Sequence, residues 1–208
     1  DARLETPAGV FSVTSPLAGK FNLYNILAAT AAALAVDIDP PRIQEGIAAL
    51  AAVPGRLEKV SRPGEPVVFV DYAHKEDALR KVLETLSAFR ERRIITVFGC
   101  GGDRDRTKRP LMGRAAGEMS DLAVVTSDNP RTEDPLEIID QIEAGLREAS
   151  LKKYRPEDFE DRYGGQGYVV LPDRREAIRR AVAFAGPGDI VLIAGKGHED
   201  YQIIGTEK

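Results

Sequence analysis

Two short segments of the sequence combine side chains that could hold a small zwitterion. The first, Ser127-Asp128-Asn129-Pro130-Arg131, offers a carboxylate, an amide and a guanidinium within four residues. An arginine can donate two parallel hydrogen bonds to a carboxylate, whereas aspartate and asparagine oxygens accept hydrogen bonds from an ammonium group. The segment therefore favours an amino acid as ligand, although an Asx turn followed by a helix cap would also explain Asp128 and Pro130.

The second segment, Gly195-Lys196-Gly197-His198-Glu199, has glycines that would let a ligand approach the backbone. Glu199 could bind a second ammonium group, and Lys196 could meet a phosphate or have no ligand. The two histidines of the chain are His74 and His198. Their spacing does not demand a metal site, so we expect both to make hydrogen bonds.

A third segment, residues 99–106, is rich in glycine and arginine. Gly99-x-Gly101 resembles the start of a dinucleotide fingerprint, but Arg104 stands where the third glycine would be, which argues against NAD. The turn could instead bring backbone N–H groups and arginines to an anion, or it could be a flexible loop with solvated arginines. The chain contains no Gly-x-x-x-x-Gly-Lys-Ser/Thr sequence, so it lacks the usual cradle for a triphosphate.

The elements that position these segments follow from the hydrophobic pattern. Beyond residue 66, apolar runs alternate with helical patterns, which indicates an α/β fold with a mostly parallel sheet and helices on both faces. Strands are predicted at residues 67–70, 94–98, 122–126, 168–171 and 190–194, and helices at 76–89, 109–119, 135–148 and 173–184. Ligands of such sheets bind beyond the carboxyl ends of the strands, where all three segments fall, as does Asp71-Tyr72-Ala73-His74.

The first 60 residues follow a different pattern. Residues 10–14 resemble a strand with nothing before it to pair with, helices are predicted at 21–35 and 40–50, and a short strand at 56–60. The Pro-rich run 61–66 predicts a linker between two domains, residues 1–60 and 61–208. Residues 152–167 lack a period and predict an exposed insertion.

Composition limits the classes of function. The net charge of -4 gives no basic excess for nucleic acid or anionic lipid, so small molecules are the expected partners. The longest apolar stretch, residues 26–36, is shorter than the ~20 residues of a membrane span, and no signal peptide precedes it. The single Cys100 excludes a disulfide framework. We expect a globular, cytoplasmic protein that is part of something longer.

Six motifs, taken in order along the chain, resemble the Mur ligase family. They are Phe21-Asn22-Leu23-Tyr24-Asn25, Gly55-Arg56-Leu57-Glu58, Asp71-Tyr72-Ala73-His74, Gly101-Gly102-Asp103-Arg104-Asp105, Asp128-Asn129-Pro130-Arg131 and Gly195-Lys196-Gly197-His198-Glu199. The resemblance implies that residues 1–60 are the C-terminal portion of a central ATP-binding domain. It implies that residues 61–208 are a Rossmann-like C-terminal domain that binds an amino acid. The N-terminal and P-loop portions of the same ligase, with most Mg²⁺ ligands, would lie outside this chain.

The Asp-Asn-Pro-Arg element resembles the signature of family members that add meso-diaminopimelate to UDP-N-acetylmuramoyl-L-alanyl-D-glutamate in peptidoglycan synthesis. The implied enzyme is an ATP-dependent ligase that forms an acyl phosphate, which an amino group of diaminopimelate attacks. This chain would bind the amino acid and part of ATP without turning over alone, because the resemblance places no catalytic residue in it. The alternatives are a non-catalytic Mur-like amino-acid-binding module and a ligase of the folylpolyglutamate or cyanophycin synthetase type.

The resemblance also implies roles for individual residues. ATP would contact Asn25, Arg56, Asp71, Tyr72 and His74, with Asn25 and Tyr72 near the base, Asp71 near the ribose and Arg56 near the phosphates. The residues implied to bind meso-diaminopimelate are Arg104, Asp128, Asn129, Arg131, Gly195 and Glu199. Among these, the two arginines would pair the distal carboxylate that distinguishes diaminopimelate from lysine.

Overall fold

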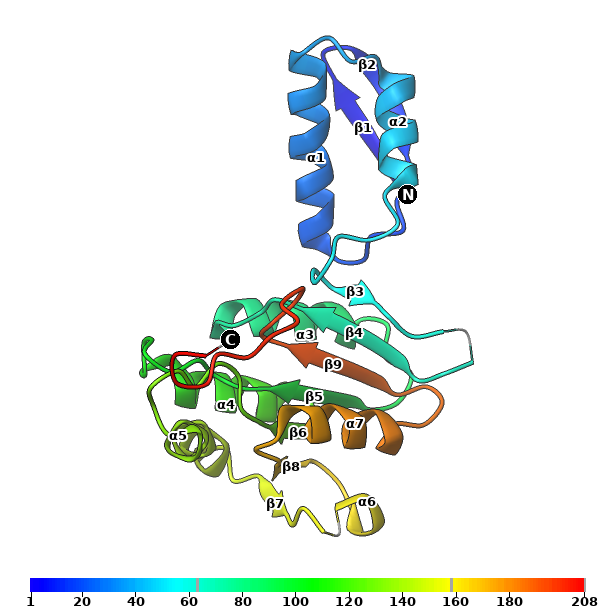
Figure 1. The fold of residues 1–208 in the computed structure, drawn as a ribbon. Coiled ribbons are helices and arrows are strands. Elements are labelled where there is room, and N and C mark those ends of the chain that lie inside the picture. The colour runs from blue at the N-terminus through cyan, green and yellow to red at the C-terminus, as the bar shows by residue number, and fades with distance from the viewer. Residues whose placement is uncertain (63, 158, 208) are drawn as a thin grey trace. The chain divides into compact units, whose positions relative to one another are not determined.

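The computed structural model describes residues 1–62, 64–157 and 159–207 (Figure 1). Pro63, Asp158 and Lys208, which fall in the predicted linker, the predicted insertion and the chain end, lie outside the described residues. The chain divides into two compact units, Asp1–Val53 and Pro54–Lys208. None of the helices in the described part of the chain is long and apolar enough to cross a membrane.

The first unit consists of a β-hairpin and two helices. Strand β1 (Ala2–Thr6) pairs antiparallel with β2 (Gly9–Val13), and helices α1 (Lys20–Ala35) and α2 (Pro40–Ala49) follow (Figure 1). The two helices match the prediction closely. We expected the first predicted strand to have no preceding strand as a partner. This expectation was wrong, because β1 precedes β2 and pairs with it along its whole length.

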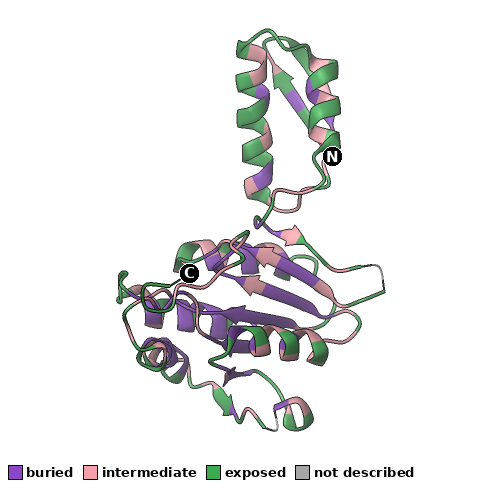
Figure 2. Cartoon of the chain, in the orientation of Figure 1, coloured by how far each residue is buried: buried purple, intermediate pink, exposed green. Residues whose placement is uncertain are grey.

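The second unit is built around a seven-stranded sheet. The sheet order is β3-β4-β9-β5-β6-β8-β7, and every neighbouring pair is parallel except β3 with β4. The strands are β3 (Glu58–Lys59), β4 (Val67–Asp71), β5 (Ile94–Phe98), β6 (Leu122–Val125), β7 (Lys152–Tyr154), β8 (Gly167–Val170) and β9 (Ile190–Ala194). The central strands are almost entirely buried, which is why their sequences are continuous apolar runs (Figure 2).

Helices cover both faces of this sheet. Helices α3 (Glu76–Ser87), α4 (Lys108–Met119) and α5 (Pro135–Glu148) pack against one another in succession. Helix α7 (Arg174–Phe184) contacts β5, β6 and β9 on the opposite face (Figure 1). Right-handed crossovers require these helices to lie on opposite faces. The connection through α3 runs across the sheet from β4 to β5, whereas the connection through α7 runs in the opposite direction from β8 to β9. The structure confirms the predicted α/β fold with a mostly parallel sheet.

The predicted helix starts are also present in the structure. The Asp134 side chain caps α5 by accepting a hydrogen bond from Leu136 N at 2.7 Å, and Pro135 occupies the first helical position. The Asp173 side chain caps α7 by accepting from Glu176 N at 2.8 Å. These caps fix where the loops after β6 and β8 end.

The structure differs from the sequence prediction in two places of this unit. The described residues of 61–66 connect β3 to β4, which pair with Glu58 opposite Val70, so the units divide between Val53 and Pro54 rather than after residue 60. Residues 152–167 are not simply an exposed insertion. They contain β7, which extends the sheet, and α6 (Phe159–Arg162), whose Phe159 is fully buried. Charged residues around a few apolar ones concealed both elements.

Candidate functional site

A cavity of about 540 Å³ lies at the carboxyl ends of β4, β9, β5 and β6, which are neighbours in the sheet. We call it the strand-end cavity. It is lined by Tyr72, His74, Lys75, Gly101, Arg104, Asp105, Lys108, Asp128, Asn129, Arg131, Gly195 and Glu199. All six residues implied to bind the amino acid are in this lining, together with two of those implied to bind ATP. Four loops that are distant in sequence therefore form one site.

Charged groups of both signs line the strand-end cavity. The cationic residues are Lys75, Arg104, Lys108 and Arg131, and the anionic residues are Asp105, Asp128 and Glu199. A ligand with both carboxylate and ammonium groups can pair with such a lining, whereas a purely anionic ligand would face three carboxylates. Lys75, Lys108 and Asp105 were not among the predicted ligands, because nothing in their sequence surroundings separates them from ordinary surface residues.

Glycines allow the two loops on one side of the cavity to touch. Gly102 N donates to Asn129 O at 2.8 Å, and a Cβ atom on Gly102 would lie 1.9 Å from Pro130 O. A Cβ on Gly99 would likewise lie 2.3 Å from Thr126 O. The glycine-rich turn after β5 therefore packs directly on the loop after β6 instead of forming a flexible loop.

Arg131 is held firmly at the edge of the cavity. Its φ angle of 54° is in the left-handed region, and its Nη1 donates to Gly102 O at 2.7 Å. Its backbone N donates to Ile203 O at 3.0 Å, and its backbone O accepts from Gly205 N at 2.7 Å. Beyond a longer bond from Nη1 to Asn129 O, no other group among the described residues bonds the guanidinium. Its remaining N–H groups can therefore pair with a ligand carboxylate.

A buried polar network joins the loops after β4, β6 and β9. Lys196 Nζ lies 2.8 Å from Asn129 Oδ1 and 3.3 Å from Glu199 Oε2. Asn129 Nδ2 and Tyr72 Oη each donate to Glu199, both at 3.3 Å. Burial raises the pKa of Glu199, but the Lys196 ammonium and the bonds from Asn129 and Tyr72 outweigh it and lower the pKa below its usual value. Glu199 is therefore a carboxylate that can accept from an ammonium group.

Lys196 is the member of this network whose partner the sequence left open. It is only 7 % exposed, and its ammonium bonds two of the residues implied to bind the amino acid. The signal that could have found it is its position, two residues after a fully apolar strand and between two glycines. A lysine placed there is carried below the surface, where its ammonium needs an anionic or carbonyl partner.

Three of the residues implied to bind ATP form an aromatic and cationic cluster in the second unit. The Arg56 guanidinium lies 4.7 Å from the centre of the Tyr72 ring, and the His198 ring stacks on Tyr72 with centroids 5.8 Å apart. The exposed His74 contacts Tyr72 edge-on at 4.9 Å. A flat ring beside an exposed guanidinium fits the base and the phosphates of a nucleotide.

Asp71 is buried and bonds only the backbone in the described structure. Its Oδ2 accepts from Leu57 N and its Oδ1 from Ala73 N, both at 2.7 Å. Its carbonyl oxygen accepts from Gly195 N at 3.0 Å and Gly197 N at 3.2 Å. Burial raises the pKa of the Asp71 carboxyl group above its usual value, although the bonds from Leu57 N and Ala73 N act to lower it. The geometry thus fits a role in joining the loops that carry Arg56, Tyr72 and Lys196.

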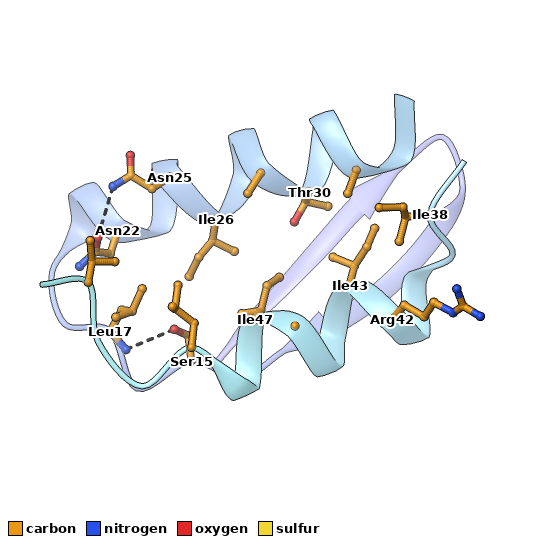
Figure 3. Close-up of a pocket in the computed structure, with 15 residues that line it drawn as sticks. Ser15, Leu17, Asn22, Asn25, Ile26, Thr30, Ile38, Arg42, Ile43 and Ile47 are labelled. Carbon is orange, nitrogen blue, oxygen red and sulfur yellow. Dashed lines mark hydrogen bonds between the residues drawn. The ribbon is translucent and has the colours of Figure 1, made fainter. Parts of the chain in front are cut away.

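Asn25 belongs to the first unit and is described by itself. It lies on α1 beside a mostly apolar cavity of about 400 Å³ between α1 and α2, and its Nδ2 donates to Asn22 Oδ1 at 3.3 Å (Figure 3). Its predicted contact with adenine stays a prediction. Within the described residues of both units, no group of three or more His, Cys, Asp or Glu could hold a metal ion.

The sequence of the second unit matches a family model. The model is described as "Mur ligase, glutamate ligase domain" and covers residues 55–197. The chain is also 54% identical over 205 residues to the "UDP-N-acetylmuramoyl-L-alanyl-D-glutamate--2,6-diaminopimelate ligase" of Geobacter metallireducens. That match covers 99% of this chain and 40% of the relative, so the chain spans about two fifths of the relative's length.

Solved structures give the same result. A structure named "UDP-N-acetylmuramoyl-L-alanyl-D-glutamate--2, 6-diaminopimelate ligase" is 43% identical with a TM-score of 0.65 and covers 98% of this chain and 39% of its own. A folylpolyglutamate synthase of Mycobacterium tuberculosis complexed with ADP is 25% identical with a TM-score of 0.69, covering 93% of this chain and 41% of its own. The family model and the relatives agree, and the chain belongs to the Mur ligase family.

Proposed function

We propose that the chain is the C-terminal part of an ATP-dependent ligase that joins meso-diaminopimelate to UDP-N-acetylmuramoyl-L-alanyl-D-glutamate in peptidoglycan synthesis. The observation that carries the proposal is the strand-end cavity, which brings Arg131 and Arg104 together with Asp128 and Glu199. The 54% identity with a relative named for this reaction supports it. In this proposal the chain supplies the amino-acid site and part of the nucleotide site of a cytoplasmic enzyme whose other partners are small molecules.

The ligand's chemistry matches the lining of the cavity. Meso-diaminopimelate carries two carboxylates and two ammonium groups. The arginines Arg131 and Arg104 pair carboxylates, and Asp128 and Glu199 accept from ammonium groups. L-Lysine lacks the distal carboxylate and would leave a guanidinium unpaired, which costs about 2–5 kcal/mol where a buried charge pair is broken. Because Arg131 is only half-buried, we expect a value near the lower end.

In this proposal, residues of the second unit form part of the nucleotide site. In the proposal Arg56 meets the phosphates, Tyr72 and His74 meet the nucleoside, and Asp71 holds their loops. The Mg²⁺ ligands would lie mainly in central-domain residues outside this chain. ATP, when bound, supplies the phosphoryl group that activates the D-glutamate carboxyl group. The residues of this chain hold the attacking amine in place, and such orientation lowers the entropic part of the barrier.

Calorimetric titration tests the proposal. We expect the chain to bind meso-diaminopimelate in preference to L-lysine. Arg131→Ala should lower the affinity for diaminopimelate about 30-fold, equivalent to about 2 kcal/mol, and leave the affinity for ADP unchanged. The matched control is Arg114→Ala, which removes an exposed arginine that pairs with Glu118 on α4 and should change neither affinity.

Three results would contradict the assignment. Arg131→Ala could weaken diaminopimelate and ADP equally, which would indicate general damage to the unit. L-Lysine could bind as tightly as diaminopimelate, which would favour another ligase of the superfamily. If the folded chain binds neither amino acid, the acceptor site does not lie within this chain.

A further inference from the structure

Lys196 is buried beside the proposed amino-acid site but is not among the described residues that line it. It lines a separate cavity of about 560 Å³ together with Arg174 and Tyr201. Its ammonium reaches Asn129 and Glu199, which both line the strand-end cavity. Lys196 can therefore act on a ligand of that cavity through these two side chains.

The hydrogen bonds around Asn129 determine which way its amide points. Asn129 Oδ1 lies 2.8 Å from Lys196 Nζ and 2.9 Å from Ile203 N. An ammonium group and a backbone N–H can only donate, so the atom facing them must be the amide oxygen. That oxygen has two lone pairs, and both are used. The side chain is 6 % exposed, which leaves it no bulk water as a substitute partner.

The amide nitrogen of Asn129 is left facing the carboxylate side of the network. Nδ2 donates one hydrogen to Glu199 Oε2 at 3.3 Å. No second acceptor for this nitrogen is present among the described residues, so its other hydrogen is available to a ligand in the strand-end cavity. Asn129 is thus a donor that suits a carboxylate. The Asn129 oxygen does accept from an ammonium group, but that group belongs to Lys196 and not to a ligand.

We propose that Lys196 is a positioning residue that fixes Asn129 as a hydrogen-bond donor to a carboxylate of the bound amino acid. The inference rests on the proposed function, because it assigns roles within the same site. Without the ammonium, Asn129 Oδ1 would keep only the bond from Ile203 N. The amide could then rotate and present its oxygen, which repels a carboxylate. Asp128 and Glu199 remain as the acceptors for the ligand's ammonium groups.

Asn129→Asp separates the donor role from the acceptor role. The substitution replaces Nδ2 by an oxygen and places a negative charge close to Glu199. If Asn129 donates to a carboxylate, the affinity for meso-diaminopimelate falls at least tenfold in calorimetric titration, while the affinity for ADP stays within about twofold. If Asn129 instead accepts from an ammonium group, the aspartate binds diaminopimelate as well as or better than the wild type, which would overturn the proposal.

Lys196→Met tests the positioning role, since methionine has a similar length and no charge. We expect Lys196→Met to lower the affinity for meso-diaminopimelate at least tenfold. The loss of affinity should be clearly smaller when the same change is made in an Asn129→Ala background. An undiminished loss in that background would mean that Lys196 acts on the ligand directly or through Glu199 rather than through Asn129, and would overturn the proposal. Lys153→Met is the matched control. Lys153 lies on edge strand β7, and its ammonium also pairs with a glutamate, Glu143, at 2.6 Å.

A ligand-independent measurement completes the test. The Asn129 side-chain NH₂ signals, identified by their loss in Asn129→Ala, should exchange slowly with water in the wild type and faster in Lys196→Met. Unchanged exchange would contradict the proposal. Should Lys196→Met fail to fold, Lys196→Gln can be used, since glutamine retains a hydrogen-bond donor. In that variant the Asn129 NH₂ signals should exchange at an intermediate rate. A wild-type chain that does not bind diaminopimelate defeats the proposed function, and this inference with it. Binding that Asn129→Asp leaves intact defeats the inference alone.

Discussion

Glu133 and Arg109 form a partly buried ion pair beneath the loops of the strand-end cavity. Arg109 is fully buried, and its Nη1 and Nη2 donate to the two Glu133 oxygens at 3.0 and 2.9 Å. Arg109 Nη2 also donates to Gly101 O at 3.2 Å, and Glu133 Oε1 accepts from Asp103 N at 2.6 Å. The pair therefore connects α4 to the turn after β5 and to the loop between β6 and α5, which carries both Arg131 and Glu133.

This pair predicts a pH dependence of stability. The hydrogen bonds from Arg109, followed by that from Asp103 N, lower the pKa of Glu133 from 4.5 to about 2. A carboxyl group whose pKa is lower in the folded state binds its proton preferentially in the unfolded chain. The stabilisation is complete above about pH 4.5 and is lost as the pH falls towards 2. Glu133→Gln should be less stable than the wild type at pH 6, and the difference should shrink by pH 3.

Urea unfolding of both proteins at pH 6, 4 and 3 measures this difference. Glu148→Gln, at the end of α5, is the control for removing a glutamate elsewhere. Its unfolding free energy should run parallel to that of the wild type at all three pH values. A Glu133→Gln curve that also runs parallel would show that Glu133 does not contribute to acid unfolding.

At the scale of elements, the segment 201–205 acts as a strap over the loop after β6, and we call it the C-terminal strap. Gln202 Nε2 donates to Asp128 O at 2.6 Å, and Ile203 N donates to Asn129 Oδ1 at 2.9 Å. Arg131 lies in a parallel bridge with Ile204. Every residue of the Asp-Asn-Pro-Arg element except Pro130 is thus bonded by the strap.

Removal of the C-terminal strap should weaken the proposed ligand and spare the sheet. Deletion of residues 201–208 is expected to lower meso-diaminopimelate affinity at least tenfold in calorimetry, because Asn129 and Arg131 lose backbone partners. The far-ultraviolet circular dichroism should be almost unchanged, since the strap contains no sheet strand. Ile204→Ala, whose side chain is 64% exposed, keeps the backbone bonds and should bind normally. Wild-type affinity in the truncated chain would contradict the role of the strap.

Phe159 shows how a short element can contribute to stability. Its ring is fully buried, packs edge-on against Phe184 with centroids 5.5 Å apart and lies under the Arg180 guanidinium. Phe159→Ala should destabilise the second unit by about 3–5 kcal/mol, the usual cost of emptying a buried aromatic site. Urea unfolding measures it, with Phe89→Ala as the control because Phe89 is 46% exposed. Equal losses for the two variants would indicate that α6 does not belong to the core.

At the scale of the whole molecule, the pattern of apolar residues predicted most of the second unit. The bounds of β5, α5 and β9 agree with the prediction residue for residue, because these elements are buried and carry continuous or strongly periodic apolar positions. Strands β1 and β7 were missed. Each has one buried side chain, Leu4 in β1 and Tyr154 in β7, and strands at the edges of sheets have few apolar positions to reveal them.

The site could be predicted as a set of residues but not as a set of roles. Loops at the carboxyl ends of parallel strands must converge, so the loops that carry the six residues implied to bind the amino acid could be grouped from the sequence. The direction of the Asn129 amide could not, because it depends on Lys196 and on Ile203 N, a backbone group 74 residues away. No pattern of residue types encodes a contact made by a distant backbone N–H.

The first unit differs from the second in how little apolar surface it buries. The buried residues of α1 are Asn22 and Thr30, both polar, and Thr30 Oγ1 has no hydrogen-bond partner among the described residues. Figure 3 shows Thr30 and Ile26 on the α1 side of the apolar cavity. The large apolar side chains exposed on α1 and just after it are Leu23, Tyr24, Leu27, Val36 and Ile38. A two-stranded hairpin with so small a core is marginally stable in water.

Native-state hydrogen exchange should therefore separate the two units. Helix α1 should exchange orders of magnitude faster than α5, a helix of similar length that buries Ile138, Ile139, Ile142 and Leu146. The physical reason is that opening α1 exposes little new apolar surface, whereas opening α5 exposes four large side chains. Exchange followed by mass spectrometry at several protein concentrations measures this. Equal protection at every concentration would show that the first unit is as stable as the sheet. Protection of α1 that rises with concentration would show instead that its apolar face is covered by association between copies of the chain.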